Sequence, residues 1–246
     1  MAKSISDLKS RVAQGVAYYW EARQRQSEKQ KGLGRSDQGA RGAVTGGYQM
    51  LQFSQLITNL LTEVGVAQEH IFYAQALELP GFFRPTKEWD LLVVRDGQLV
   101  AAIELKSQVG PSFGNNFNNR TEEAMGTALD LWTAFREGAL NRTVQPWLGY
   151  LFLLEDSPKS RTPVRVVEPH FKVFPEFVNA SYARRYELFC RKLVRERQYN
   201  AAAFLLSARD TGLKGVYSEP ADDLTFELFA RSLAAHAAAY GRGDKS

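Results

Sequence analysis

The sequence is poor in cysteine and histidine, the side chains that most often build disulfide frameworks and zinc sites. Cys190 is the only cysteine among 246 residues, which excludes an intrachain disulfide and favours a reducing compartment. The three histidines, His70, His170 and His236, are too scattered to give zinc-ligand spacing. A signal peptide, an apolar run of membrane-spanning length and an internal repeat are also absent. We therefore expect a cytoplasmic protein without a membrane anchor.

Strong charge of either sign is lacking too, since the formal net charge is +4 at pH 7. This modest excess suits an anionic partner without identifying one. Hydrophobic residues make up 44% of the chain, enough to bury the core of one α/β domain over residues 1–246. Within it we expect a flexible loop rich in glycine and arginine at 31–47 and a disordered tail at 241–246.

The most informative segment, residues 89–106, has the pattern of a β-hairpin. Its Asp96-Gly97 step suits a tight turn that requires positive φ. Because side chains alternate between the faces of a strand, Glu104 and Lys106 point to one face. The alternate positions predict core residues on the other face: Leu99, Ala101, Ile103 and Leu105.

A second acid, Asp90, stands at the opposite end of this hairpin and would lie beside Glu104 if the strands pair. Two carboxylates attract a hard divalent cation such as Mg²⁺, and a neighbouring Lys106 can position water or stabilise charge on a phosphate. Hydrolysis of a phosphodiester is the chemistry that this trio favours. The alternative is an edge strand that carries an ordinary exposed charge pair.

Hydrophobic periodicity predicts further helices and strands along the chain. The expected helices cover 4–29, 48–66, 121–138, 181–198 and 222–240. The expected strands cover 147–154, 164–167 and 201–206. The helix at 181–198 has one apolar face and a strongly basic one, and that basic face is either solvated or directed at an anionic partner.

The segment that follows the hairpin, KSQVGPSFGNNFNNRTEEA at 106–124, is long and rich in asparagine. Together with Trp89-Asp90 and residues 103–106, it closely resembles the XhoI family of type II restriction endonucleases, which belong to the PD-(D/E)xK nuclease class. Trp89 stands where the class signature has proline, a position at which that class often varies. The resemblance implies an α/β restriction-endonuclease-like core with a mixed central sheet flanked by helices.

The resemblance also implies an activity and its partners. It implies a homodimer in the bacterial cytoplasm that hydrolyses double-stranded DNA at the palindrome CTCGAG with Mg²⁺. Cleavage after the first C of each strand would leave 5′-phosphates on TCGA overhangs. The biology of such enzymes implies a cognate DNA methyltransferase in the same restriction-modification system.

Site residues follow from the same resemblance. Asp90, Glu104 and Lys106 are the expected catalytic residues. The expected metal ligands are Asp90, Glu104 and the main-chain carbonyl of Leu105. Glu63, at the end of the helix at 48–66, is a candidate extra acid or an exposed glutamate.

Three polar segments are the expected DNA contacts, since arginine matches guanine and asparagine matches adenine in the major groove. Their members are Arg35 and Arg41; Gln108, Ser112, Asn115, Asn116, Asn118, Asn119 and Arg120; and Arg209 and Lys214. We expect the second segment to be a loop, in which some asparagines serve only the turn. The first segment could equally be an ordinary linker.

Two other functions remain compatible with the residues. A PD-(D/E)xK nuclease of DNA repair or recombination would use the same trio without strict sequence specificity. A non-catalytic DNA-binding regulator could share the fold.

Overall fold

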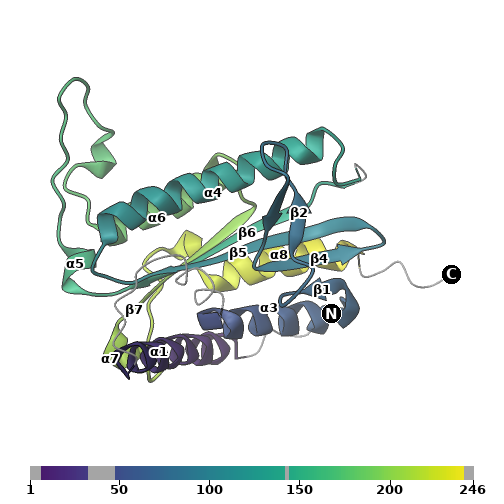
Figure 1. Ribbon diagram of the computed structural model, residues 1–246, viewed down its shortest axis with the longest axis horizontal. Coiled ribbons are helices and arrows are strands. Elements are labelled where there is room, and N and C mark those ends of the chain that lie inside the picture. The colour runs from purple at the N-terminus through teal and green to yellow at the C-terminus, as the bar shows by residue number, and fades with distance from the viewer. Residues whose placement is uncertain (1–6, 33–47, 142–143, 241–246) are drawn as a thin grey trace.

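The computed structural model describes residues 7–32, 48–141 and 144–240 and has an α/β fold built on a mixed sheet (Figure 1). Five strands lie in the order β1-β4-β5-β6-β7. They are β1 Ile71–Phe72, β4 Leu91–Arg95, β5 Gln98–Gln108, β6 Trp147–Glu155 and β7 Ala201–Ser207. The first three strands pair antiparallel, and β5, β6 and β7 are parallel. A separate hairpin pairs β2 Glu78–Pro80 with β3 Thr86–Glu88.

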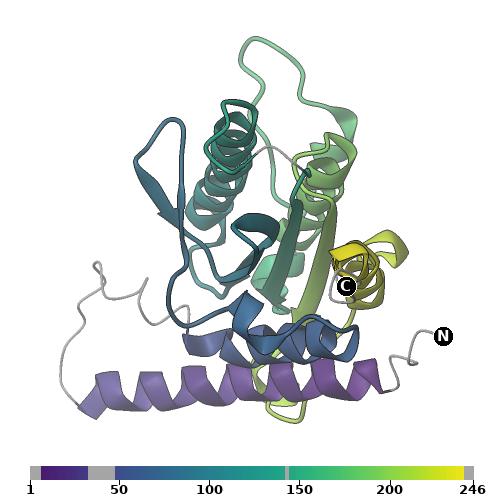
Figure 2. The same cartoon turned by 90° about the vertical axis from the view of Figure 1, so that its right-hand side faces the viewer.

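Helices cover both faces of the sheet, as expected for the central strands of such a fold. The longer helices are α1 Leu8–Gly32, α3 Leu51–Glu63, α4 Phe113–Arg136, α6 Tyr182–Arg195 and α8 Phe226–Tyr240. Figure 1 shows α4 and α6 on one face and α1, α3 and α8 on the other. Figure 2 shows α1 running beneath α3 as the outermost layer. The short elements are α5 Pro158–Arg161, α7 Arg209–Gly212, η1 Gln68–His70, η2 Pro175–Phe177 and η3 Asp222–Leu224.

The predicted hairpin at 89–106 is confirmed as β4 and β5. Asp96 and Gly97 both have positive φ, at 51° and 69°, as the tight turn requires. Ile103 and Leu105 lie in the core against α1, α3 and α8. Simple alternation predicts Leu99 on that face too, but Leu99 is buried against α4 and α6 instead. The register shifts next to Val93, and this bulge reverses the alternation at Leu99.

Most of the other predicted elements are confirmed. The helices at 48–66, 181–198 and 222–240 correspond to α3, α6 and η3 with α8, and the strands at 147–154 and 201–206 correspond to β6 and β7. Every residue of β6 is buried because helices cover both of its sides. The predicted strand at 164–167 is wrong, since 162–174 is a loop that leaves the body of the protein (Figure 1).

The two segments expected to be flexible fall mainly outside the described residues. α1 continues to Gly32, so residues 31 and 32 of the expected loop are helical. Residues 33–47, with Arg35 and Arg41, and residues 241–246 lie outside the described parts of the chain. Within the described parts, no helix combines the length and the apolar character needed to cross a membrane.

Candidate active site

A cleft of 540 Å³ opens between the β2–β3 hairpin, the carboxyl-terminal half of β5 and α4. The pairing of Leu91 with Ile103 brings the start of β4 to the middle of β5. The Asp90 main-chain N–H donates to the Ile103 carbonyl at 3.3 Å, and this bond places the Asp90 side chain at the mouth of the cleft. Glu104 and Lys106 line the same cleft from the neighbouring strand.

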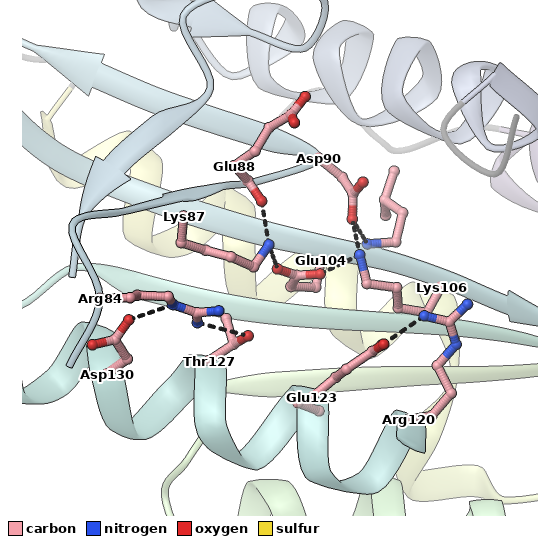
Figure 3. Close-up of polar contacts among 12 residues, drawn as sticks. Arg84, Lys87, Glu88, Asp90, Glu104, Lys106, Arg120, Glu123, Thr127 and Asp130 are labelled. Atoms are coloured by element: carbon pink, nitrogen blue, oxygen red, sulfur yellow. Dashed lines mark hydrogen bonds and ion pairs between the residues drawn. The ribbon is translucent and has the colours of Figure 1, made fainter. Parts of the chain in front are cut away.

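The three predicted catalytic side chains lie together, and both carboxylates contact the ammonium group of the lysine (Figure 3). Lys106 Nζ lies 2.8 Å from Asp90 Oδ2 and forms a second, close ion pair with Glu104 Oε2. The Leu105 main-chain N–H donates to Asp90 Oδ2 at 2.8 Å and fixes that carboxylate. The convergence that the sequence predicts is therefore present, and the catalytic roles of the three residues stay predictions.

Burial and charge act differently on the two carboxyl groups. Burial raises the pKa of Asp90 above its ordinary value, because lost hydration and the Glu104 charge outweigh the Lys106 ammonium. Burial also opposes ionisation of Glu104, but the ammonium groups of Lys106 and Lys87 hold its pKa below the ordinary value. Burial would lower the pKa of Lys106, and the two carboxylates raise it instead. The cleft thus holds two acids with opposite shifts around one cation.

The donor set fits a hard divalent cation. Lys106 Nζ shows that both carboxylates can reach a single positive centre. Glu104 Oε1 is buried beside the cleft and faces an ammonium group, which shows that this oxygen can hold a positive charge. Since the N–H and C=O of one strand residue face the same edge, the Leu105 carbonyl is directed to the side on which Asp90 lies.

The described residues contain no group of three His, Cys, Asp or Glu side chains arranged to hold a metal. The protein ligands would therefore be the two carboxylates and the main-chain carbonyl. Water and a phosphate oxygen would have to supply the other positions, which is the usual arrangement for Mg²⁺.

A second lysine in the cleft is not evident from the sequence. Lys87 comes from β3, and its Nζ lies 2.7 Å from Glu104 Oε1 and 5.4 Å from the centre of the Trp89 ring. The strand that carries it has only three residues, too few to show a hydrophobic period. Its place over the site therefore becomes visible only in the folded chain.

The β2–β3 hairpin is fixed to α4 by one buried carboxylate. Asp130 accepts hydrogen bonds from the Phe82 and Phe83 main-chain N–H groups at 2.7 and 2.8 Å and pairs with Arg84 Nε at 2.6 Å. Arg84 also donates to Thr127 on the next turn of α4. These contacts hold Lys87 above Glu104, because Lys87 lies on the returning strand of the same hairpin.

The other wall of the cleft is α4, which contributes an ion pair. Arg120 Nη1 lies 2.6 Å from Glu123 Oε2, and both side chains line the cleft opposite the hairpin (Figure 3). Glu123 adds a third carboxylate to the lining, one that is not among the expected site residues. Its position one helical turn from Arg120 is typical of an i, i+3 pair.

Comparisons with known proteins show the family of the chain. A family model described as "Restriction endonuclease XhoI" matches residues 29–219. The chain belongs to the XhoI restriction endonuclease family. It is 56% identical over 207 residues to the type II restriction enzyme BstVI of Geobacillus stearothermophilus, which covers 82% of this chain and 92% of that relative.

Two further type II restriction enzymes are similar to this chain. The type II restriction enzyme XhoI of Xanthomonas vasicola is 48% identical over 196 residues, 79% of this chain and 78% of the relative. The type II restriction enzyme AbrI of Azospirillum brasilense is 47% identical over 173 residues, 70% and 78% of the two chains. No solved structure matches.

The asparagine-rich segment of this family member is helical, so the prediction of a loop is wrong. α4 begins at Phe113, eight residues before the expected cap at Thr121. Phe113 is buried and stacks on Tyr182, and Phe117 packs edge-on against Tyr186. This i, i+4 burial outweighs the weak helix propensity of asparagine.

The helix separates the predicted DNA contacts onto two faces. Asn115, Asn118 and Asn119 are exposed, and Asn116 is half-buried. Arg120 lines the cleft beside Glu123, whereas none of these asparagines lines it. A DNA-reading role for the asparagines stays a prediction, and the structure makes them the outward face of one rigid helix.

Gln108 and Arg209 are engaged within the protein. Gln108 is 4% exposed, accepts from the Tyr186 hydroxyl and donates to the carbonyls of Ser112 and Phe113, so these contacts favour a structural role over the predicted DNA contact. Arg209 Nε pairs with Glu155 Oε1 at 2.6 Å, but its side chain is 62% exposed, so a contact of Arg209 with DNA stays a prediction. Ser112 is exposed where α4 begins, and Lys214 is exposed after β7.

Glu63 does not line the cleft, so the structure favours the exposed glutamate of the two alternatives over an extra metal ligand. α3 approaches the cleft with Met50, at its amino-terminal end. Glu63 ends the helix, about 20 Å away at 1.5 Å per residue. It pairs with Arg11 at 2.9 Å on the surface. Among the described residues, Glu123 is the further acid that lines the cleft.

The basic face of α6 is largely paired with acids of the protein. Arg184 and Arg191 pair with Glu187, and Lys192 pairs with Glu176. These contacts favour a solvated role for this face over a DNA contact.

Proposed function

We propose that this protein is a type II restriction endonuclease that cuts both strands of DNA at CTCGAG with Mg²⁺. Cleavage after the first C would leave 5′-phosphates on TCGA overhangs. The observation that carries the proposal is the Lys106 ammonium held between Asp90 and Glu104 inside a cleft. Membership of the XhoI family supports the DNA substrate, and the name of the relative XhoI supports the site.

The cleft residues divide the work of phosphodiester hydrolysis between them. A bound Mg²⁺ supplies an acidified water and neutralises charge on the phosphate. Asp90, Glu104 and the Leu105 carbonyl hold that cation. Lys106 positions the attacking water and stabilises the charge that grows on the phosphate.

Arg120 suits a contact with the DNA backbone better than with a base. Its guanidinium lies in the cleft with the catalytic residues, where the scissile phosphate has to enter. A planar guanidinium can bind two phosphate oxygens at once. Binding would require Arg120 to leave Glu123, because the two form an ion pair in the free protein.

Sequence reading falls to the exposed face of α4. An α-helix fits the major groove, and asparagine pairs with adenine N6 and N7 through two hydrogen bonds. Asn115, Asn118 and Asn119 are spaced to follow one helix face, since residues three and four apart are neighbours. A palindromic site is matched by a two-fold homodimer in which each subunit reads a half-site and cuts one strand. Such an enzyme would act in the bacterial cytoplasm alongside a cognate methyltransferase.

The decisive test uses two plasmids that differ by one base pair within a single CTCGAG. Each is incubated with purified protein in Mg²⁺ or in EDTA, with Glu104→Gln as the inactive control. Linearisation that needs both the site and Mg²⁺, with TCGA overhangs on sequencing the ends, supports the proposal. Cutting of both plasmids would instead indicate a repair or recombination nuclease. Binding without cutting at any divalent cation would indicate a regulator.

A further inference from the structure

Glu104 carries two ammonium groups, one on each carboxylate oxygen. Lys106 pairs with Oε2, and Lys87 lies 2.7 Å from Oε1. Glu104 is 2% exposed, so these two lysines supply the charge that keeps it ionised. Lys106 also pairs with Asp90, so Lys87 is the lysine that serves Glu104 alone, and it does so at Oε1.

The Lys87 contact is an ion pair to the one Glu104 oxygen that Lys106 does not contact. The same ammonium also donates to the Glu88 carbonyl of its own strand, so its donors are divided between two acceptors. An ammonium shared in this way can exchange one anionic partner for another. Oε1 is also the Glu104 oxygen that Lys106 leaves open for a cation.

A divalent cation on Glu104 would meet Lys87 as a competitor. Both bind the same oxygen, and their like charges repel strongly in a half-buried cleft. With Asp90, Glu104, Lys87 and Lys106 all charged, the free site is already electrically balanced. A divalent cation that enters alone gives this cluster a net positive charge. A divalent cation that enters together with a phosphodiester gives it a smaller net positive charge, because the phosphate is negative.

Lys87 has a place to go when DNA is present. Its side chain is 21% exposed at the rim of the cleft, on the wall opposite Arg120. Its four-carbon stem lets the ammonium swing while β3 stays fixed. A phosphodiester in the cleft would pass within reach of both walls.

We propose that Lys87 is a positioning residue that couples metal binding to DNA binding. In the free protein it occupies Glu104 Oε1 and keeps cations out. When DNA enters, its ammonium moves to a phosphate oxygen and frees Glu104 for the metal. The proposal rests on the metal-dependent nuclease function above and adds an order to it, in which the cleft takes up its cation only with the substrate.

The test measures metal binding without DNA, by titration calorimetry with Mg²⁺. Lys87→Met removes the competing charge and nearly preserves side-chain volume. Lys87→Arg keeps the charge. Lys172→Met is the matched control, because Lys172 pairs with Glu168 on the surface, is 89% exposed and does not line the cleft.

We expect Lys87→Met to bind Mg²⁺ about ten-fold or more tightly than the wild type in the absence of DNA. The Lys87→Arg and Lys172→Met variants should stay near the wild-type affinity. A purely structural role for Lys87 predicts the opposite sign, since a disordered Glu104 would bind Mg²⁺ more weakly. An unchanged or weakened affinity of Lys87→Met, in a variant whose circular dichroism matches the wild type, overturns the proposal.

A second measurement follows the coupling itself. Ca²⁺ replaces Mg²⁺ so that a CTCGAG duplex stays intact, and DNA affinity is measured with and without the cation. The factor by which Ca²⁺ strengthens DNA binding equals the factor by which DNA strengthens Ca²⁺ binding. In Lys87→Met this factor should shrink by as much as the metal affinity of the DNA-free protein rises. An equal factor in both proteins would refute the coupling. Failure of wild-type cutting would refute the proposed function instead, so the two outcomes are distinct.

Discussion

The two acids of the cleft should affect the stability of the free protein in opposite directions when each is neutralised. Asp90→Asn and Glu104→Gln both preserve shape and remove one negative charge. The folded-state pKa of Asp90 is raised, and that of Glu104 is lowered. At pH 7 the ionised Asp90 therefore opposes folding, whereas the ionised Glu104 favours it. We expect Asp90→Asn to raise the free energy of unfolding and Glu104→Gln to lower it.

The size of the Glu104 effect follows from its contacts. The substitution removes the charge from two ion pairs, with lysines whose side chains are both 21% exposed. A hydrogen bond to a charged group contributes about 1.5–3 kcal/mol, and partial exposure together with the remaining amide oxygen reduces the cost. We expect a cost of about 1–3 kcal/mol, with the midpoint of thermal unfolding falling by about 2–4 °C for each kcal/mol.

Acidification should separate the two effects. The protonated form of Asp90 stabilises the folded protein. This contribution is fully present below the unfolded pKa of about 3.9 and is lost as pH rises through the raised folded pKa. The contribution of Glu104 is present above its unfolded pKa, about 4.3, and is lost as pH falls through its lowered folded pKa. On lowering the pH from 7, the advantage of Asp90→Asn should therefore disappear before the penalty of Glu104→Gln does.

The assay is thermal unfolding in EDTA without DNA, from pH 7 to pH 4. Asp223→Asn is a matched control, since Arg191 holds the pKa of that exposed carboxyl below its ordinary value and its removal should cost less than about 1 kcal/mol. Because Lys87 is proposed to keep cations out of the DNA-free cleft, replacing EDTA with Mg²⁺ should change the stability of the wild type and of this control only slightly. The reasoning is refuted if Asp90→Asn destabilises the protein at pH 7 as much as Glu104→Gln does.

Three further variants test the rest of the site. Glu63→Gln should leave cleavage within about two-fold and cost under about 1 kcal/mol, since it breaks only a surface pair; a large drop in cleavage would return Glu63 to the metal site. The double variant Asn118→Ala and Asn119→Ala should weaken binding to CTCGAG relative to random DNA by about 1–3 kcal/mol for each base that is no longer read. Its melting temperature should not fall, because alanine is the better helix former. Equal weakening on both DNAs would show that these two asparagines do not read bases. Asp130→Ala should destabilise the protein by about 2–4 kcal/mol and reduce cleavage, because it releases the hairpin that carries Lys87; stable, fully active protein would contradict this.

The catalytic hairpin could be predicted because its information is local. Alternating side chains and the Asp96-Gly97 turn fix both strands within one short segment, and Asp90 is placed beside Glu104 by that pairing alone. The face of Leu99 could not be predicted in the same way. A bulge is a one-residue change in pairing, and the sequence around Val93 gives no local signal for it.

The start of α4 shows how local preference and burial can disagree. Asparagine and glycine favour turns, and both crowd the first two turns of this helix. The apolar residues at 113, 117 and 124 follow helical spacing, so the sequence does indicate a helix here. The turn preference of the asparagines and the glycine is the more evident pattern. The cost of the polar residues is met by packing of Phe113 and Phe117 against α6, which only the tertiary structure supplies.

Lys87, Glu123 and Glu63 were beyond local inference for another reason. Arg84 and Asp130 are 46 residues apart, and their pairing decides that Lys87 lies over Glu104. A helix that passes the cleft can present either end to it, so the sequence leaves both alternatives for Glu63 open, and the structure brings the other end of α3 to the cleft. Sequence patterns identify which face of an element is apolar, but they do not fix where along its length a neighbour crosses.

The link between β5 and α4 connects the helix face proposed to read DNA to the residues proposed to cut it. Gln108, two residues after Lys106, holds the Ser112 and Phe113 carbonyls and is itself held by Tyr186 of α6. The Gly110 main-chain N–H donates to Glu155 at 2.6 Å, and Arg209 supports that carboxylate from the far side.

A turn tied at so many points cannot absorb a displacement of α4 by itself. Asn119 and Arg120 are adjacent on that helix, one on the outward face and one in the cleft. A base contact that shifts the first turns of α4 must therefore shift the Arg120–Glu123 pair and the end of β5 with them. This connection gives correct base contacts a direct physical route to the geometry around Lys106.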